Sequence, residues 1–193
     1  MNYPEIVFDS QTRMHIIKHF SVLSDDFMND LKNTSKTITD IKQRLTLPGS
    51  KFFADFAADP DELFKKSKEI IIFNQNQLPW INDKSEFVVD FSVSDYPDGI
   101  GTNNLIHHNE LSEKQRKIVK YREISGSRIG CVEGVPSKTF TLNIILQKKT
   151  DIQFRIVTLF PGKMAPAFPS SYAKDSEPYK KSMTFWKENY FIV

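Results

Sequence analysis

The sequence predicts an α+β fold in which N-terminal helices pack on a C-terminal antiparallel β-sheet, connected as a meander. Apolar residues recur at helical spacing over residues 1–80, and from residue 87 onward they alternate with polar residues as in half-buried strands. Of the 193 residues, 39% are hydrophobic and 16 are Phe, which is enough apolar surface to bury a core. We therefore expect one domain over 1–193, with a mainly helical part at 1–80, the antiparallel sheet at 81–169 and an aromatic tail at 170–193 that packs back onto the domain.

Three helices are expected in the N-terminal part. The first covers Ser10 to Phe20, because the cap-like Asp9 and Ser10 precede apolar residues at helical spacing. The second spans residues 25–45, carries an apolar stripe and stops at Pro48-Gly49. The third opens at Pro60, in its first turn, and runs toward Ile70.

Strand patterns begin after residue 80. Residues 87–93 alternate apolar and polar side chains, which predicts a strand, and Tyr96-Pro97-Asp98-Gly99 predicts a turn. Further strands are expected at 104–107 and 127–133, and a solvated helix or helical turn is expected at 112–121.

The clearest pattern is a β-hairpin. Residues 139–146 and 152–160 alternate around a turn at 148–151. Pro161-Gly162 ends the hairpin, and an extended segment with Pro166 and Pro169 leads into the tail.

Composition excludes several classes of protein. The 26 basic and 24 acidic side chains leave a formal net charge of +2, so any basic site must be local. The single Cys131 rules out an intrachain disulfide and a cysteine-cluster metal site, which fits a reducing compartment. No apolar run reaches the roughly 18 residues of a membrane span, and the first twenty residues lack a secretory apolar core. We expect no membrane association and a cytoplasmic location unless another system exports the protein.

Two histidines on the first predicted helix form the sharpest local motif. His15 and His19 are four residues apart, so their imidazoles can approach a common point, and Lys18 between them can neutralise a phosphate. An alternative is that one histidine packs at the helix edge and the other is solvated. A metal site is less favoured, because no Glu lies between the histidines and no third ligand follows nearby.

A local cluster of basic residues flanks the start of the predicted sheet and could hold phosphates by charge-assisted hydrogen bonds, or could simply form a solvated rim. Its basic members are Lys120, Arg122, Arg128 and Lys138, and Tyr121 lies between the first two in sequence. Strict alternation also puts Thr158 on the apolar face of its strand, where a hydroxyl needs a partner or a function. Gly99-Ile100-Gly101 is not a dinucleotide fingerprint and the chain has no phosphate-binding loop motif, so we expect no cofactor.

Two segments carry a family resemblance. The first is His15-Ile16-Ile17-Lys18-His19-Phe20, and the second is Phe154-Arg155-Ile156-Val157-Thr158-Leu159-Phe160-Pro161-Gly162. Together they resemble bacterial ribonuclease toxins of the barnase, EndoU, colicin E5 and RelE-like superfamily, in which helices pack on one face of an antiparallel sheet. The resemblance implies a metal-independent endoribonuclease toxin or effector that cleaves RNA by 2′-OH attack and is held in check by an immunity or antitoxin protein.

The resemblance also implies roles for individual residues. His15 and His19 would act as base and acid, Arg128 or Lys138 as the cation that holds the phosphate, and Thr158 as a positioning hydroxyl. The remaining basic residues would bind RNA: Lys18, Lys120 and Arg122.

Two other classes of function stay open. One is a non-enzymatic binding or accessory protein of phage or mobile-element origin, in which the histidines are structural. The other is a histidine-ligated metal hydrolase, which a chelator would inactivate. The sequence makes no prediction of oligomeric state.

Overall fold

The computed structural model describes residues 5–31, 35–47, 49–74, 78, 86–103, 119–124, 127–132, 137–189 and 191–192. Its helices and sheets confirm the α+β class. Contacts between residues divide the chain into two compact units. The first comprises Met1–Thr102 and Lys138–Lys163, and the second comprises Asn103–Ser137 and Met164–Val193. The expectation of one domain over the whole chain stays a prediction.

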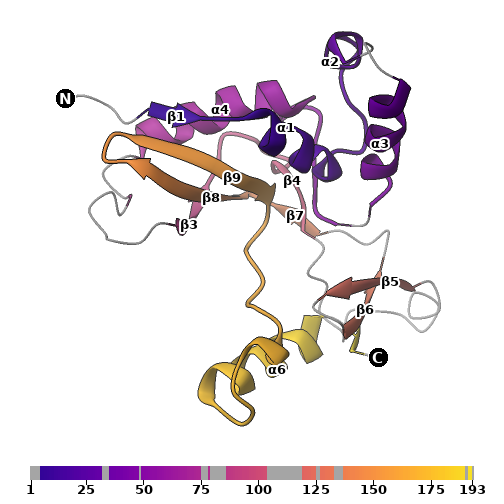
Figure 1. Ribbon diagram of the computed structural model, residues 1–193, viewed down its shortest axis with the longest axis vertical. Helices are drawn as coiled ribbons and strands as arrows, with labels where there is room; N and C mark the ends of the chain where they lie inside the picture. The colour runs from indigo at the N-terminus through magenta and orange to yellow at the C-terminus, as the bar shows by residue number, and fades with distance from the viewer. Residues whose placement is uncertain are drawn as a thin grey trace. The chain divides into compact units, whose positions relative to one another are not determined.

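The main sheet belongs to the first unit and has the strand order β1-β9-β8-β3. Strands β8 (Thr141–Thr150) and β9 (Gln153–Pro161) form the predicted hairpin, and β3 (Glu86–Ser92) pairs antiparallel with β8 (Figure 1). Strand β1 (Glu5–Val7) instead runs parallel to β9. The sheet is therefore mixed, and the expectation of a purely antiparallel sheet was wrong at this edge.

One face of this sheet is apolar and builds the core. Its buried side chains include Phe91 from β3, Leu146 from β8 and Ile156 from β9. Helices α1 (Ser10–Ile16) and α4 (Pro60–Phe73) add Ile16 and Leu63 to the same cluster, and Figure 1 shows both helices beside the β8–β9 hairpin. The amphipathic patterns of the sequence thus bury their apolar sides against each other.

A β-bulge interrupts the β8–β9 pairing. Leu146 pairs with Ile156, whereas the next residue back along β8, Ile145, pairs with Thr158, so Val157 is an extra residue in β9. The alternation of β9 shifts there, and the core receives Ile156 and then Leu159. Thr158 therefore leaves the apolar face on which strict alternation had put it and shares the opposite face with Ile145. The prediction for the face of Thr158 was wrong, because a single inserted residue reverses which face each later side chain takes.

The first helix ends in a tighter turn. Asp9 caps α1 by accepting a hydrogen bond from the Thr12 amide, and the chain continues from α1 into a 3-10 helix, η1 (Ile17–His19). Lys51 stabilises the end of this segment by donating to the carbonyl oxygens of Lys18 at 2.6 Å and Phe20 at 3.1 Å.

The predicted helix over residues 25–45 appears as two elements, α2 (Asp25–Asp30) and α3 (Ser35–Leu45), with residues 32–34 outside the described part. The sequence around the junction is rich in Asn, Asp, Thr and Ser, which compete with helical hydrogen bonds. A second small sheet has the order β2-β4-β7, from Lys51–Phe52, Gly101–Asn103 and Ser137–Thr139.

The second unit contains its own strands. β5 (Val119–Ile124) and β6 (Ser127–Val132) are antiparallel, and β10 (Phe191–Ile192) adds to β6. The helix predicted at 112–121 was wrong for residues 119–121, which belong to β5, and its other residues lie outside the described part. The strand predicted at 104–107 lies outside it as well.

The C-terminal part of the second unit is a helix on a short turn. Helix α6 (Glu177–Asn189) follows the 3-10 helix η4 (Pro169–Ser171), and the ring of Trp186 lies 5.5 Å from that of Phe168. Ser182 fixes this packing by donating to the Ala167 carbonyl oxygen at 2.7 Å.

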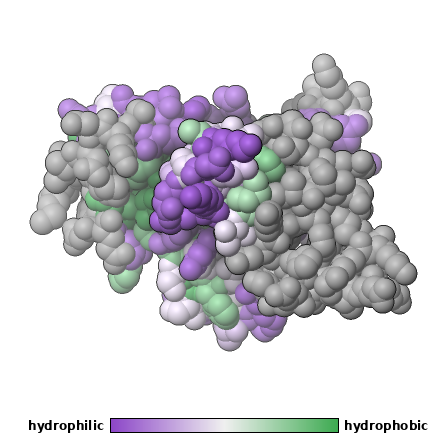
Figure 2. All heavy atoms as spheres, turned by 90° about the horizontal axis from the view of Figure 1, so that it is seen from below, coloured by the Kyte–Doolittle hydropathy of each residue, from purple (hydrophilic) through white to green (hydrophobic). Residues whose placement is uncertain are grey.

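The exposed surface is mixed in character. Figure 2 shows hydrophilic and hydrophobic described residues close together on one face. Large exposed apolar side chains are scattered along the chain, as is ordinary for protein surfaces, so they do not mark a site. They include Val22, Phe73, Phe140 and Ile152. Within the described residues, no helix is long and apolar enough to cross a membrane.

Candidate functional site

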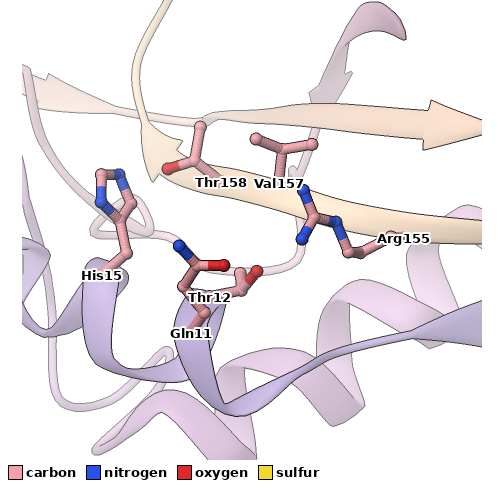
Figure 3. Close-up of a pocket in the computed structure, with 6 residues that line it drawn as sticks. All are labelled: Gln11, Thr12, His15, Arg155, Val157 and Thr158. Carbon is pink, nitrogen blue, oxygen red and sulfur yellow. The ribbon is translucent and has the colours of Figure 1, made fainter. Parts of the chain in front are cut away.

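A cavity of about 200 Å³ lies between α1 and β9 within the first unit. Helix α1 contributes Gln11, Thr12 and His15, and β9 contributes Arg155, Val157 and Thr158 (Figure 3). Two residues that the sequence singled out, His15 and Thr158, therefore line the same cavity from opposite ends of the chain.

Helical spacing and the bulge together build this cavity. Gln11 and His15 are four residues apart on α1 and so lie on one helix face. The bulge at Val157 brings Thr158 to the face of β9 that carries Arg155. Thr12 joins the two elements, because its buried hydroxyl donates to the Ile156 carbonyl oxygen at 2.8 Å.

Arg155 is held by the residue that caps α1. Its Nη1 lies 3.0 Å from Asp9 Oδ2, while Asp9 Oδ1 accepts from the Thr12 amide at 2.8 Å. The pKa of Asp9 lies below its ordinary value, first because the Thr12 amide donates to the carboxylate and then because Arg155 binds it. Sequence analysis did not select Arg155, although it is the one charged side chain between Phe154 and Phe160.

On the face of the main sheet that carries Arg155, several buried polar atoms have no hydrogen-bond partner in the described structure. They include Thr158 Oγ1 and Arg155 Nε, and also the side-chain oxygen of Gln147, which pairs with Arg155 across the strands. Leaving a buried polar group unpaired costs about 1–3 kcal/mol. A ligand that pairs with such groups would recover part of that cost.

His15 contacts a lysine. Its Nε2 lies 3.1 Å from Lys18 Nζ. An ammonium can only donate, so Nε2 accepts and the imidazole is neutral, with its proton on Nδ1. A neutral imidazole is the form that can take a proton from a substrate.

His19 has different surroundings. Its ring is buried, Nδ1 donates to the Ser50 carbonyl oxygen at 3.0 Å, and the ring stacks on Phe160 with centroids 5.7 Å apart. Burial and then the charge of Lys18 lower the pKa of His19 to about 3. His19 is therefore neutral at pH 7 and is not among the residues that line the cavity, which argues for a structural role.

The predicted basic residues are divided between the two units. Lys138 is exposed and pairs with Asp98, with Nζ and Oδ1 2.6 Å apart. Lys120 and Arg122 belong to β5, and Arg128 belongs to β6, so these three lie in the second unit. In the described ranges, no group of three or more His, Cys, Asp or Glu side chains is arranged to hold a metal.

A larger cavity of about 530 Å³ lies between α4 and residues 92–96. Its cation, Lys66, is already engaged, because Nζ lies 3.0 Å from Glu62 Oε1 and 5.4 Å from the ring centroids of Phe56 and Tyr96. The smaller cavity, with its unpaired donors, is therefore the better candidate for a functional site.

No protein-family model, curated protein or solved structure matches this chain.

Proposed function

We propose that the chain is a metal-independent endoribonuclease that cleaves RNA by attack of a 2′-OH group on the adjacent phosphate. The observation that carries the proposal is that a neutral imidazole, His15, lines one cavity with the guanidinium of Arg155 and the hydroxyl of Thr158. This set supplies a base, a cation and a hydrogen-bond donor, and Lys18, in contact with His15, can supply the acid that protonates the leaving oxygen when no metal takes part.

The proposed reaction uses the contact between His15 and Lys18 to move protons. His15 Nε2, released by Lys18, takes the proton of the 2′-OH as the oxygen forms its bond to phosphorus. The bond from phosphorus to the 5′ oxygen breaks, and that oxygen takes a proton from the Lys18 ammonium. The contact between Lys18 and His15 then returns the proton from imidazolium to amine. The products are a 2′,3′-cyclic phosphate and a 5′-hydroxyl, with no net change in protons.

The test is cleavage of a short RNA and of total RNA by the purified full chain, with and without EDTA. We expect EDTA-resistant cleavage with cyclic phosphate ends. His15→Ala should reduce the rate by about 10²–10⁴-fold, the contribution of a general base. Lys42→Ala, at an exposed position on α3, is the matched control and should cleave like the wild type. Equal cleavage by His15→Ala and the wild type would contradict the proposal, as it would point to a contaminating nuclease.

The toxin or effector role has a separate test. Induced expression of the wild type in a bacterial host should arrest growth, whereas His15→Ala at equal protein level should not. An immunity or antitoxin protein would then be recognised by its ability to restore growth. Growth unaffected by the wild type would argue against a toxin even if RNA is cleaved in vitro.

One contact favours a second candidate, a non-enzymatic binding protein. While the Lys18 ammonium occupies His15 Nε2, the ring cannot accept a proton, and the cavity would hold an anion without reacting. RNA that is bound but intact in every sample would support this candidate over the ribonuclease.

A further inference from the structure

We propose that Arg155 and Thr158 form a subsite for a single phosphodiester anion, and that Asp9 is the positioning residue of Arg155. The inference deepens the proposed function and rests on it for the identity of the anion as a nucleic-acid phosphate. It concerns binding alone, so it is testable without any cleavage.

One nitrogen of the Arg155 guanidinium is anchored and another is unpaired among the described residues. Asp9 takes Nη1 at 3.0 Å, the side chain keeps 25% of its surface exposed, and Nε has no partner in the described structure. The guanidinium is planar and presents its donors in a fixed fork. Anchoring Nη1 therefore also sets the direction of the remaining N–H groups, and Figure 3 shows the guanidinium group at the end of Arg155 that faces the other lining residues.

Thr158 supplies the second donor. The bulge puts it on the face that carries Arg155, and its Oγ1 is buried without a partner among the described residues. Because Thr158 lines the cavity, an anion bound beside it would accept a hydrogen bond from this hydroxyl. The site therefore gains a hydrogen bond on binding that the empty site lacks.

The charge of the cavity favours a monoanion. Among the six lining residues, Arg155 alone carries a full charge when His15 is neutral, and the Asp9 carboxylate lies against it. Lys18, whose Nζ lies 3.1 Å from His15 Nε2, adds a second cation, so Arg155, Lys18 and Asp9 together carry one net positive charge, which matches the one negative charge of a phosphodiester. The second charge of a terminal phosphate would meet the Asp9 carboxylate without a further cation among these residues.

The positioning role of Asp9 can be tested by a substitution that keeps its role as the N-cap of α1. Asp9→Asn preserves helix capping, because Asn is as good an N-cap as Asp, but removes the charge that holds Arg155. Asp59→Asn is the matched control, since Asp59 caps α4 by accepting from the Asp61 and Glu62 amides and lies outside the cavity. The two variants separate positioning from capping.

The direction in which Asp9→Asn changes the affinity for the anion also separates positioning of Arg155 from simple charge attraction. Removing a carboxylate raises the local positive potential, so an unstructured basic patch would bind an anion more tightly in Asp9→Asn. Positioning predicts the opposite, a Kd raised by roughly 3- to 10-fold, which is the effect of freeing one long side chain.

The experiment is an NMR titration of the full chain with a 2′-deoxy dinucleotide, a phosphodiester that cannot be cleaved by 2′-OH attack. We expect shifts in α1 and β9 for the wild type and for Asp59→Asn, weaker binding by Asp9→Asn and Thr158→Val, and weaker binding of a 5′-mononucleotide. Absence of binding to the wild type, or equal or tighter binding by Asp9→Asn, would overturn the subsite. Binding with these effects in a chain that leaves RNA intact would support the subsite while refuting the ribonuclease.

Discussion

The burial of His19 predicts a specific dependence of stability on pH. Its pKa is about 3 in the folded chain and near 6.5 when unfolded, so the unfolded state binds the proton more readily. The stabilisation is fully present above pH 6.5 and is lost progressively as the pH falls toward 3. Between pH 7 and pH 4.5 the free energy of unfolding should fall by roughly 2–3 kcal/mol because of His19, with a limiting slope of about 1.36 kcal/mol per pH unit.

The matched variant is His19→Asn, whose amide can still donate to the Ser50 carbonyl oxygen but does not titrate. We would measure urea unfolding by far-ultraviolet circular dichroism at several pH values and compare the slopes of the two proteins. Carboxylates with a lowered pKa, such as Asp9, lose their contribution below the window used, and other groups cancel in the comparison. Parallel pH profiles for the wild type and His19→Asn would refute the reasoning.

Three further predictions concern stability and are measured by the same urea unfolding at pH 7. Thr12→Val removes the hydrogen bond to the Ile156 carbonyl oxygen and should lower the free energy of unfolding by about 0.5–1.5 kcal/mol; a loss within error would mean that this hydrogen bond does not help to hold α1 against β9. Leu63→Ala opens a cavity beneath α4 and should lower the free energy of unfolding by about 2–5 kcal/mol, and a smaller loss would indicate that neighbouring side chains fill the space. Gly101→Ala brings a Cβ against the Lys51 carbonyl oxygen and should lower the free energy of unfolding by roughly 1–3 kcal/mol. An unchanged urea midpoint would show that β2 moves aside to make room for the methyl group.

The hairpin was predictable because its signal is local and long. Alternation over two strands and a polar turn identify β8 and β9 without knowledge of the rest of the fold. Strand β1 was not predictable, since three residues are too few to establish a period. Its parallel pairing with β9 depends on segments from opposite ends of the sequence.

The candidate site was only partly predictable. His15 stood out through its spacing from His19, and Thr158 as a polar group in an apolar pattern, but nothing in the alternation of β9 marks the bulge that brings Thr158 to the cavity lined by His15. His15 and His19 also look equivalent in sequence. The change from α-helix to 3-10 helix at Ile17 turns His19 further from His15 than a continuous α-helix would, and burial then separates their chemistry.

The hydrogen bond from Thr12 to Ile156 has a consequence for the order of assembly. It joins positions 144 residues apart, so the cavity wall made by α1 is synthesised long before the wall made by β9. At translation rates of about 5–20 residues per second, roughly 7–30 s separate the two. A chain still attached to the ribosome therefore carries His15 without Arg155 or Thr158, and any activity of the cavity begins only after β9 has emerged and paired.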